Sequence, residues 1–338
     1  MRTALIGLGR MGMRHAHAVY DCGFPLVGIM DVNPEVVEKA GAVLDLSKDR
    51  CFTSATSLLQ TVKPDLLIIA TTAPSHKSLA LEACASGVKA ILCEKPMSTG
   101  LSECQEMISS CRAAGVRLAV NHQMRFMEHY QKPKQLAVSE AFGGLTSIVV
   151  SAGNFGLAMN GTHYFEMFRF VTGELPVKVS AWFADEDVPN PRGAEFKDAA
   201  GCVRLETESG KRFYLDCFPD QGHGLHVTYN CRNGRISIDE LSGRMDFTVR
   251  LQEYRNAPTT RYGLPSENGT DGLSPTDATT SSAAVIAALA DGEGYPTGEE
   301  GLIAMKVLVA AHISNQRGGA IVDLRTEELP MELQLPIA

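Results

Sequence analysis

The first 120 residues carry five short apolar runs in which polar residues do not alternate with apolar ones. The runs occupy positions 4–6, 26–30, 66–70, 90–93 and 118–120. Longer stretches with helical spacing of apolar residues separate them, including 34–43, 76–86 and 102–114. Strands without polar alternation are buried on both faces, as in a parallel sheet that helices cover on each side. We therefore expect an α/β fold that begins with a doubly wound parallel sheet.

The first apolar run leads directly into Gly7-Leu8-Gly9-Arg10-Met11-Gly12. A GxGxxG turn between a strand and a helix, with an acidic residue about 20 positions later, is typical of dinucleotide binding. Asp31 follows Gly12 by 19 residues, where a carboxylate accepts hydrogen bonds from the adenosine ribose. We predict that residues 1–122 form an NAD(P)-binding Rossmann domain. The predicted cofactor contacts in this turn are Gly7, Gly9, Arg10, Met11, Gly12 and Asp31.

The residues around Asp31 favour NAD over NADP. A carboxylate at this position repels a 2′-phosphate, and no arginine or lysine follows it in Val32-Asn33-Pro34. The alternative, a tight glycine turn that binds no ligand, is less consistent with the strand before the turn and the helix after it.

The third run ends in Ala70-Thr71-Thr72-Ala73-Pro74-Ser75-His76. Ligands of doubly wound sheets bind at the C-terminal ends of the strands. We therefore predict that Thr71, Thr72, Pro74 and His76 line the cofactor. Ser75 is equally well explained as the cap of the next helix, and His76 as an ordinary residue of that helix's first turn.

The fourth run, residues 90–93, ends abruptly in Glu94-Lys95-Pro96. Pro96 stops the strand, and an X–Pro bond in such a place is sometimes cis. The ordinary explanation of Lys95 is a salt-bridged surface lysine. Its place at the ligand edge of the sheet instead favours a cation held where a ligand needs it. We predict that Glu94 and Lys95 contact the cofactor.

Composition and charge exclude several classes of function. A net charge of −8 argues against a nucleic-acid partner. No run is long and apolar enough to span a bilayer, and no leader precedes Arg2, so we expect a cytoplasmic protein without a membrane partner. The nine cysteines form no CxxC pair, which is typical of reduced thiols. The spacing of His223, His226 and Cys231 fits no common zinc site, and we predict no metal.

From about residue 146 the pattern changes to short runs in which polar and apolar residues alternate, including 147–151, 177–182, 226–229 and 235–238. Asn233-Gly234 between the last two is a strong hairpin signal. This alternation predicts an antiparallel sheet with one covered face. Helices return at about 274–290 and 299–314. We predict a second domain over residues 123–338, whose C-terminal segment can pack back on the first.

Taken together, the motifs resemble the glucose-fructose oxidoreductase, inositol dehydrogenase and MocA-like (Gfo/Idh/MocA) family of NAD(P)-dependent oxidoreductases. The resemblance rests on GLGRMG, ATTAPSH, AILCEKPM, NHQMRF at 121–126, NGTH at 160–163 and YPTGEE at 295–300. It implies a Rossmann domain followed by an α/β domain with a large open, mainly antiparallel sheet for substrate binding. It also implies a homodimer or homotetramer formed through that sheet.

The resemblance implies catalytic roles for two residues. Lys95 would stabilise the alkoxide that develops when a sugar or cyclitol CH–OH is oxidised, and His163 would be the acid/base. Many members carry an aspartate four residues before this histidine, where this chain has Met159. Asn160 can bind a substrate hydroxyl or cap the helix, but it cannot be a base. Glu166, one helical turn beyond His163, can orient the imidazole.

Other polar residues at the expected ligand edge are candidates for substrate contacts. We predict His122, Arg125, Asn154 and Asn160 in this role, beside Lys95 and His163. Arg125 can bind a substrate carboxylate or phosphate, or it can pair with a structural acid. His223 and His226 lie, like Asn154, in glycine-rich sheet ends, which admit ligands but also mark bulges.

The favoured function is an NAD-dependent dehydrogenase or reductase that acts on a sugar, a cyclitol or a nucleotide-linked sugar. The absence of the aspartate at Met159 keeps a second hypothesis open, an NAD-binding sensor or regulatory protein without redox turnover. A third hypothesis is a glycosidase or eliminase that uses bound NAD transiently.

Overall fold

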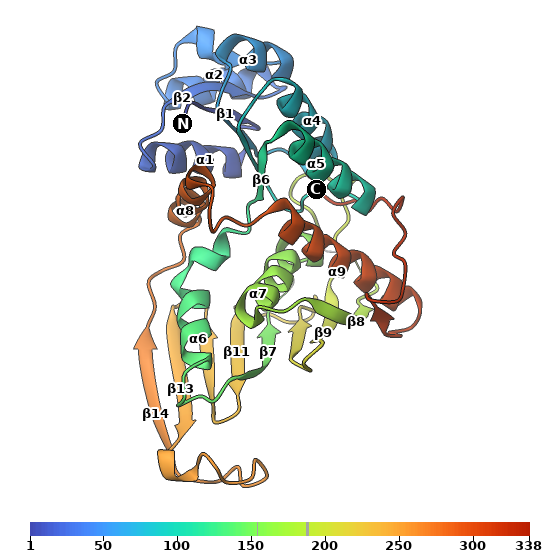
Figure 1. The fold of residues 1–338 in the computed structure, drawn as a ribbon. Coiled ribbons are helices and arrows are strands. Elements are labelled where there is room, and N and C mark those ends of the chain that lie inside the picture. Colours follow the sequence, from blue (N-terminus) through green and yellow to red (C-terminus); the bar gives the residue numbers. More distant parts are fainter. Residues whose placement is uncertain (154, 187–188) are drawn as a thin grey trace. The chain divides into compact units, whose positions relative to one another are not determined.

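The computed structural model describes residues 1–153, 155–186 and 189–338, and Figure 1 shows their helices and strands. They form two compact units. Unit 1 comprises residues 1–123, 277–305 and 330–338, and unit 2 comprises residues 124–276 and 306–329. Two C-terminal segments therefore belong to unit 1. The domain boundary between residues 122 and 123 stays a prediction.

Unit 1 is built on a six-stranded parallel sheet with the order β3-β2-β1-β4-β5-β6. Its strands are β1 (Thr3–Ile6), β2 (Leu26–Met30), β3 (Cys51–Phe52), β4 (Leu66–Ile69), β5 (Ala90–Cys93) and β6 (Arg117–Val120). Every residue of β1, β4 and β5 is buried, because helices cover both faces. The strand order reverses between β1 and β4, which is the switch point of a doubly wound sheet. The predicted Rossmann fold is confirmed.

The helices of unit 1 begin and end at local sequence signals. They are α1 (Arg10–Asp21), α2 (Pro34–Val43), α3 (Ala55–Val62), α4 (His76–Ala85), α5 (Leu101–Ala114), α8 (Ala278–Asp291) and the first part of α9 (Gly298–Gln316). Asn33 caps α2 by accepting a hydrogen bond from the Glu35 N–H at 3.0 Å, and Gly115 ends α5 with a φ of +68°. Within the described ranges of the chain, none of the helices has the length and apolar character that a bilayer crossing requires.

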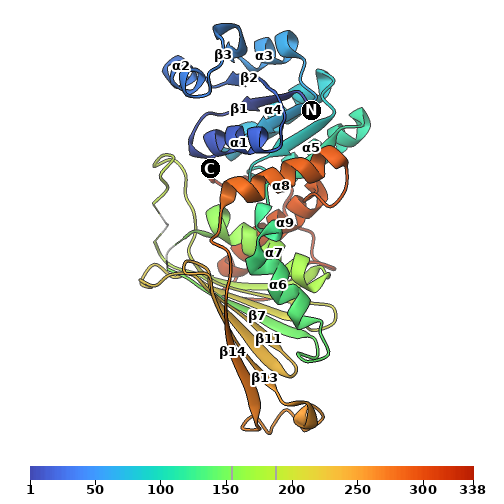
Figure 2. The same cartoon turned by 90° about the vertical axis from the view of Figure 1, so that its left-hand side faces the viewer.

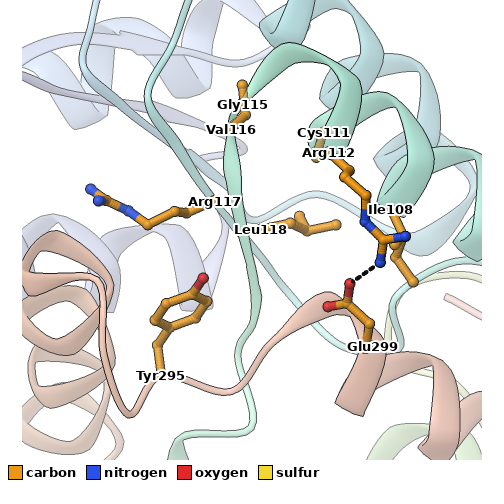
Figure 3. A pocket seen from close by; sticks show the side chains of 9 residues that line it. All are labelled: Ile108, Cys111, Arg112, Gly115, Val116, Arg117, Leu118, Tyr295 and Glu299. Carbon is orange, nitrogen blue, oxygen red and sulfur yellow. Dashed lines mark hydrogen bonds and ion pairs between the residues drawn. The ribbon is translucent and has the colours of Figure 1, made fainter.

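A hollow of about 200 Å³ lies in unit 1 beside the start of β6 (Figure 3). Arg112 and Glu299 pair across it at 2.9 Å, and Arg117 and Tyr295 also line it. Because Arg117 is the first residue of β6, the hollow is at the N-terminal end of this parallel strand. Ligands of doubly wound sheets bind at the other end, so we assign this hollow no part in the candidate site.

Unit 2 is built on a nine-stranded sheet with the order β14-β13-β12-β11-β7-β10-β9-β8-β15. Its strands are β7 (Leu145–Ser151), β8 (Pro176–Phe183), β9 (Gly201–Thr207), β10 (Arg212–Asp216), β11 (His226–Cys231), β12 (Gly234–Asp239), β13 (Arg244–Arg250), β14 (Ser266–Gly272) and β15 (Val322–Asp323). All neighbours pair in antiparallel fashion except β7 and β10. The predicted large, mainly antiparallel sheet is confirmed.

One face of this sheet is covered by helices α6 (Glu128–Ala137) and α7 (Thr162–Thr172), as Figure 2 shows. Apolar side chains that alternate along the strands fill this side, for example Ile148 and Val150 on β7 and Phe213 and Leu215 on β10, all of them buried. The alternation that predicts an antiparallel sheet thus follows from burial of one face only.

Strand β14 is not predicted by the alternation of polar and apolar residues. The sequence of β14, SENGTDG, contains no apolar side chain. In the structure β14 pairs with β13 along its whole length, from Arg244 opposite Gly272 to Arg250 opposite Ser266. This segment therefore forms a strand because its backbone pairs with the free edge of β13, although its side chains have low β-propensity.

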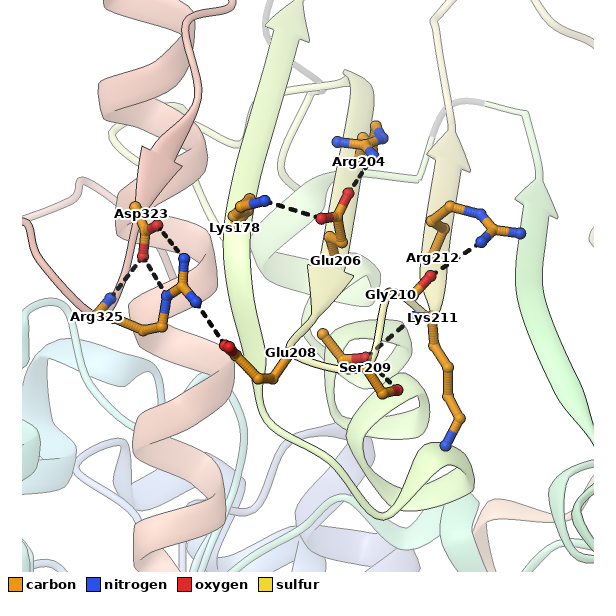
Figure 4. Close-up of polar contacts among 11 residues, drawn as sticks. Lys178, Arg204, Glu206, Glu208, Ser209, Gly210, Lys211, Arg212, Asp323 and Arg325 are labelled. Atoms are coloured by element: carbon orange, nitrogen blue, oxygen red, sulfur yellow. Dashed lines mark hydrogen bonds and ion pairs between the residues drawn. The ribbon is translucent and has the colours of Figure 1, made fainter.

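The other face of the sheet carries both charged and large apolar side chains. Trp182 is 50% exposed and Tyr214 38% exposed. Figure 4 shows Lys178 and Arg204 converging on Glu206, at 3.0 Å and 2.5 Å, and Arg325 bonded to Asp323 and Glu208. Ion pairs therefore neutralise part of the charge on this face, and two aromatic side chains remain exposed on it.

Candidate functional site

The glycine-rich turn between β1 and α1 is packed tightly against the end of β4. Gly7 has a φ of +90°, a conformation that favours glycine. A Cβ atom at Gly7 would lie 2.7 Å from the carbonyl carbon of Ala70 and 2.8 Å from the backbone nitrogen of Thr71. A Cβ atom at Gly12 would lie only 1.9 Å from the carbonyl oxygen of Gly7. Both glycines are therefore needed for α1 to approach the strands closely.

Gly9 has a different role, because it leaves the N-terminus of α1 open. It stands at the N-cap position without a side chain that could cap the helix, and the first turn holds no acidic residue. A Cβ atom at Gly9 would meet none of the described atoms within 4 Å. Gly9 and Arg10 are exposed here, and Met11 is half-buried. Open space beside the first N–H groups of a helix fits the pyrophosphate of a dinucleotide.

Asp31 follows β2 directly and supports the same turn. Its Oδ2 accepts a hydrogen bond from the Leu8 N–H at 2.9 Å, and its Oδ1 accepts one from the Asn33 N–H at 3.0 Å. A carboxylate oxygen can accept two hydrogen bonds, so both oxygens keep capacity for ribose hydroxyls. The glycine turn and this carboxylate together fit an NAD-type dinucleotide.

The end of β4 turns through a short 3₁₀ helix, Ala73–Ser75, into α4. The Ser75 hydroxyl donates to Thr71 Oγ1 at 2.7 Å or to the Thr72 carbonyl oxygen at 3.0 Å. Ser75 occupies the N-cap position of α4, but its side chain makes no capping hydrogen bond. Thr71 and Thr72 are half-buried and Pro74 is exposed, and their contacts with a cofactor stay predictions.

Glu94, at the end of β5, joins several elements of unit 1. Its Oε1 accepts hydrogen bonds from His15 Nε2 of α1 at 2.7 Å and from Asn121 Nδ2 after β6 at 2.8 Å. Its Oε2 accepts one from the backbone N–H of Lys95 at 3.2 Å. Asn121 also contacts Ser282 of α8 at 3.3 Å. The backbone that carries Lys95 is thereby held from both neighbouring helices, α1 and α8.

The charge of Glu94 is stabilised in a buried place. Burial acts to raise the pKa of Glu94, but the hydrogen bond and attraction from His15, the positive charge of Lys95 and the Asn121 amide hold it at about 2. Glu94 is 5% exposed, while Lys95 beside it is half-buried. A permanent carboxylate therefore lies next to the lysine. A direct contact of Glu94 with the cofactor stays a prediction.

His76 is the first residue of α4 and is almost fully buried. Its Nε2 lies 3.2 Å from the Thr71 carbonyl oxygen, and its Nδ1 lies 3.2 Å from that of Pro96 and 3.3 Å from that of Met97. Burial lowers the pKa of His76, and a neutral imidazole donates from only one nitrogen at a time. The ring thus bridges the ends of β4 and β5, and its predicted contact with the cofactor stays untested. The Lys95–Pro96 peptide bond is cis.

In unit 2, His163 is the second residue of α7. A π-helical turn, Leu157–Gly161, leads directly into this helix. His163 is 7% exposed, so its side chain is buried in unit 2. The helix buries most of its residues, because apolar side chains at Phe165 and Phe168 pack on the sheet.

Asp198 is a buried carboxylate of unit 2 that the sequence pattern does not predict. Its Oδ1 accepts from the Ala158 N–H at 2.7 Å and its Oδ2 from the Met159 N–H at 2.8 Å. It packs on Gly156, where a Cβ atom would lie 2.2 Å from Asp198 Oδ2. An acidic group is thus held against the backbone of Met159. No spacing signal connects Asp198 with this turn, because 39 residues separate it from Met159.

Arg125 and Glu166 form a buried ion pair in unit 2. The guanidinium of Arg125, which is 8% exposed, donates to Glu166 Oε1, and Arg169 donates to the same oxygen at 2.8 Å. Arg125 and Lys134 also lie over the Phe170 ring, at 5.3 Å and 3.8 Å from its centre. The structure therefore favours pairing with a structural acid for Arg125, and a substrate contact stays a prediction. Glu166 pairs with Arg125 and Arg169, and its predicted role in orienting His163 stays a prediction.

The remaining candidates have different surroundings. His122 follows β6 in unit 1 and is 3% exposed. The Asn160 side-chain amide donates to the Phe155 carbonyl oxygen at 2.8 Å, and the N-cap of α7 is Gly161, so Asn160 does not cap the helix. Asn154 lies outside the described residues. Substrate contacts of all three stay predictions.

His223, a further candidate in unit 2, has protein partners on both ring nitrogens. Its Nε2 lies 3.2 Å from Ser151 Oγ and 2.9 Å from Gln221 Oε1, and its Nδ1 lies 2.6 Å from the Gly224 carbonyl oxygen. Across positions 1–153, 155–186 and 189–338, no three His, Cys, Asp or Glu residues are grouped so that they could hold a metal ion.

Residues 1–122 match the model of the GFO_IDH_MocA family, described as an oxidoreductase family with an NAD-binding Rossmann fold. An inositol 2-dehydrogenase of Rubrobacter xylanophilus is 30% identical over 259 residues, which cover 71% of this chain and 72% of that protein. The chain belongs to the Gfo/Idh/MocA family of oxidoreductases. The resemblance inferred from the motifs is confirmed, and with it the class of enzyme, a dehydrogenase.

Other Gfo/Idh/MocA relatives match to different extents. A D-apiose dehydrogenase of Paraburkholderia graminis is 30% identical over 239 residues, 64% of this chain, and the match spans 60% of the relative's length. A solved oxidoreductase from Agrobacterium radiobacter, in complex with NAD+, L-tartaric acid and magnesium, has a TM-score of 0.80 at 22% identity. It covers 96% of this chain and 98% of its own, so the family fold extends over almost the whole sequence.

Proposed function

We propose that this protein transfers a hydride between NAD and a CH–OH or C=O carbon of a sugar, a cyclitol or a nucleotide-linked sugar. The observation that carries the proposal is the position of Lys95. It follows β5 at the same edge of the parallel sheet as the glycine turn after β1. A half-buried cation at the ligand edge of a dinucleotide domain is what hydride transfer from an alcohol requires.

Asp31 supports NAD as the cofactor in preference to NADP. The glycine turn would hold the pyrophosphate and Asp31 the ribose, and a carboxylate there repels a 2′-phosphate. When bound, the nicotinamide supplies the acceptor or donor of the hydride. The chain's own residues must then stabilise the negative charge on the substrate oxygen and accept the proton of the substrate hydroxyl.

In the proposed reaction Lys95 stabilises the negative charge that develops on the substrate oxygen. Its backbone N–H is bonded to Glu94, so the start of the side chain is fixed before substrate binds. Partial burial strengthens a cation's attraction for an oxyanion, because less water screens it. The family resemblance assigns Lys95 the same role.

His163 is the proposed acid/base. Removal of the hydroxyl proton as the hydride leaves requires a group that titrates near neutral pH, and imidazole is such a group. The family motif supports His163, while Met159 in place of an aspartate means that a second base at that position is missing. We propose that Asp198, bonded to the Met159 N–H, supports the turn before α7 in its place.

The substrate class is proposed from relatives. Those named above act, by their names, on inositol and D-apiose, and a structure of the same fold, from Acidithiobacillus ferrooxidans, is a UDP-N-acetylglucosamine 3-dehydrogenase at 21% identity. All three names denote polyhydroxylated rings or their nucleotide derivatives. We therefore propose this chemical class without naming one compound.

A homo-oligomer through the large sheet is part of the proposal. Trp182, Tyr214 and Val149 are exposed on the strands of unit 2, at 50%, 38% and 36%. Val149 lies opposite Tyr214 in the paired strands, so these two side chains share one face. An apolar patch between ion pairs is typical of a surface that another subunit covers.

The first experiment is to measure NADH formation with purified protein, NAD or NADP, and a panel of sugars, cyclitols and nucleotide sugars. Lys95→Ala and His163→Ala should each abolish turnover and leave the fold intact. Lys89→Ala is a matched lysine control, because Lys89 stands just before β5 at its other end and pairs with Asp65 at the surface. His17→Ala is the matched control on an exposed histidine.

Two results would redirect the proposal. Tight NAD binding without turnover on any compound would favour the sensor hypothesis. Product formation with retained cofactor and no net NADH would favour a glycosidase or eliminase that uses NAD transiently. Turnover that survives in Lys95→Ala would refute the assigned role of Lys95.

A further inference from the structure

Unit 2 contains a hollow of about 440 Å³ that the proposed reaction does not use. Three arginines line it: Arg212 at the start of β10, Arg232 after β11 and Arg250 at the end of β13. The hydroxyl-bearing residues Thr146 and Thr259 also line it. The volume is within the range of small-molecule sites, which is about 300–1,000 Å³.

Two of the arginines are held in place by backbone carbonyls. Arg250 donates to the carbonyl oxygens of Ala257 at 3.2 Å and Arg261 at 3.1 Å. Arg212 donates to the carbonyl oxygen of Gly210 at 2.9 Å, as Figure 4 shows. A carbonyl orients a guanidinium but does not neutralise it, and each guanidinium has five N–H donors. Donors therefore remain for a ligand on groups that are already oriented.

Several arginines of unit 2 pair with acids, as Arg204 does with Glu206, and Arg244 with Asp246 at 2.8 Å. The three arginines that line this hollow differ from them. In the part of the chain that the structure describes, Arg212, Arg232 and Arg250 take part in no ion pair, and no carboxylate lines the hollow. The smaller hollow of unit 1, by contrast, has its Arg112 paired with Glu299.

We propose that the hollow lined by Arg212, Arg232 and Arg250 binds a small oxyanion of the phosphate type. Guanidinium groups bind phosphate oxygens in pairs of parallel hydrogen bonds, and the threonine hydroxyls add neutral donors. The chain's net charge of −8 opposes a long polyanion such as nucleic acid, so the ligand is a compact anion. Free phosphate and the phosphate group of a metabolite share this chemistry.

The test is calorimetric titration of the full-length protein with inorganic phosphate, with glucose 6-phosphate and with glucose. We expect phosphate to bind with a Kd of about 1 mM or tighter, and any binding of glucose at the substrate site to be the same in wild type and Arg232→Gln. Tighter binding of glucose 6-phosphate than of inorganic phosphate identifies a phosphorylated metabolite as the source, and the reverse order identifies free phosphate. Either order supports the site.

Arg232→Gln and Arg250→Gln should each weaken phosphate binding about tenfold, and Arg244→Gln should not. Arg232 is exposed, so its replacement tests the site even if Arg250→Gln disturbs the loop that it holds. Phosphate bound at the glycine turn of unit 1 would not respond to these changes. Equal binding in wild type and Arg232→Gln would overturn the proposal. The absence of phosphate binding in wild type would also overturn it. If the oligomer then dissociates in Arg232→Gln, the arginines form a subunit contact.

Discussion

His15 Nε2 lies 2.7 Å from Glu94 Oε1, although the two residues are 79 positions apart in the chain. His15 belongs to α1, whose N-terminus forms the dinucleotide turn, and Glu94 directly precedes Lys95. His15 is completely buried and Glu94 is 5% exposed, so little water competes with their hydrogen bond. This one contact links the helix proposed to hold the cofactor with the strand end that carries the proposed catalytic cation.

Replacing His15 tests this link. His15→Leu leaves a buried carboxylate without one of its donors, and we expect the free energy of unfolding to fall by about 3 kcal/mol. His15→Gln is the matched control, because its amide N–H₂ can donate to Glu94, and its loss should stay within about 1 kcal/mol. Urea unfolding followed by circular dichroism measures both. Equal losses in the two variants would show that the hydrogen bond does not matter.

Two glycines of the dinucleotide turn should respond differently to an added methyl group. A Cβ atom at Gly9 meets no described atom, so Gly9→Ala should keep the stability of the fold and weaken NAD binding about tenfold or more. A Cβ atom at Gly12 collides with the Gly7 carbonyl oxygen, so Gly12→Ala should lower stability by about 2 kcal/mol or more. Thermal unfolding and fluorescence titration with NAD separate the two effects. Unchanged NAD affinity in Gly9→Ala would place the pyrophosphate elsewhere.

The preference for NAD should depend on the charge of Asp31. Asp31→Asn keeps an acceptor for the Leu8 N–H but removes the negative charge that repels a 2′-phosphate. We expect the ratio of the NADP Kd to the NAD Kd to fall about tenfold. Asp45→Asn makes the same change of net charge at another position of unit 1 and should leave the ratio unchanged. A constant ratio in Asp31→Asn would refute the assignment.

The stability of unit 2 should depend on the ionisation of Glu240. This residue is 7% exposed and accepts hydrogen bonds from the hydroxyls of Tyr130 and Tyr164, both at 3.0 Å. Burial raises the pKa of Glu240 from 4.5 to about 7, against the effect of these two bonds. Between these values the folded state keeps a proton that the unfolded state has lost.

The free energy of unfolding should therefore fall as the pH rises from about 4.5 to about 7, by about 3 kcal/mol from this residue. Glu240→Gln cannot ionise and should lose this part of the pH dependence. Chemical denaturation at several pH values measures it, with the exposed Glu267→Gln as the control. The same pH dependence in Glu240→Gln and wild type would contradict the prediction.

The sequence alone was sufficient for the parts of the fold that depend on local patterns. Apolar runs without polar alternation predict the buried parallel strands, and polar alternation predicts most of the antiparallel sheet. The helix α2 begins and ends at the predicted residues, because Asn33 and Pro34 are strong local start signals. The spacing of Gly7, Gly9 and Gly12 predicts the dinucleotide turn, and the motifs around Lys95 and His163 identify the family.

Tertiary structure alone decided which polar groups meet. The Ser75 hydroxyl bonds back to Thr71 and Thr72 and makes no capping bond to α4, and β14 forms because an edge of β13 is available to it. His15 reaches Glu94, and Asp198 reaches Met159, across 79 and 39 residues. The physical reason is that local periodicity encodes which face of an element is buried. The partner of a buried polar side chain is instead set by how distant elements pack, and no short stretch of sequence contains that information.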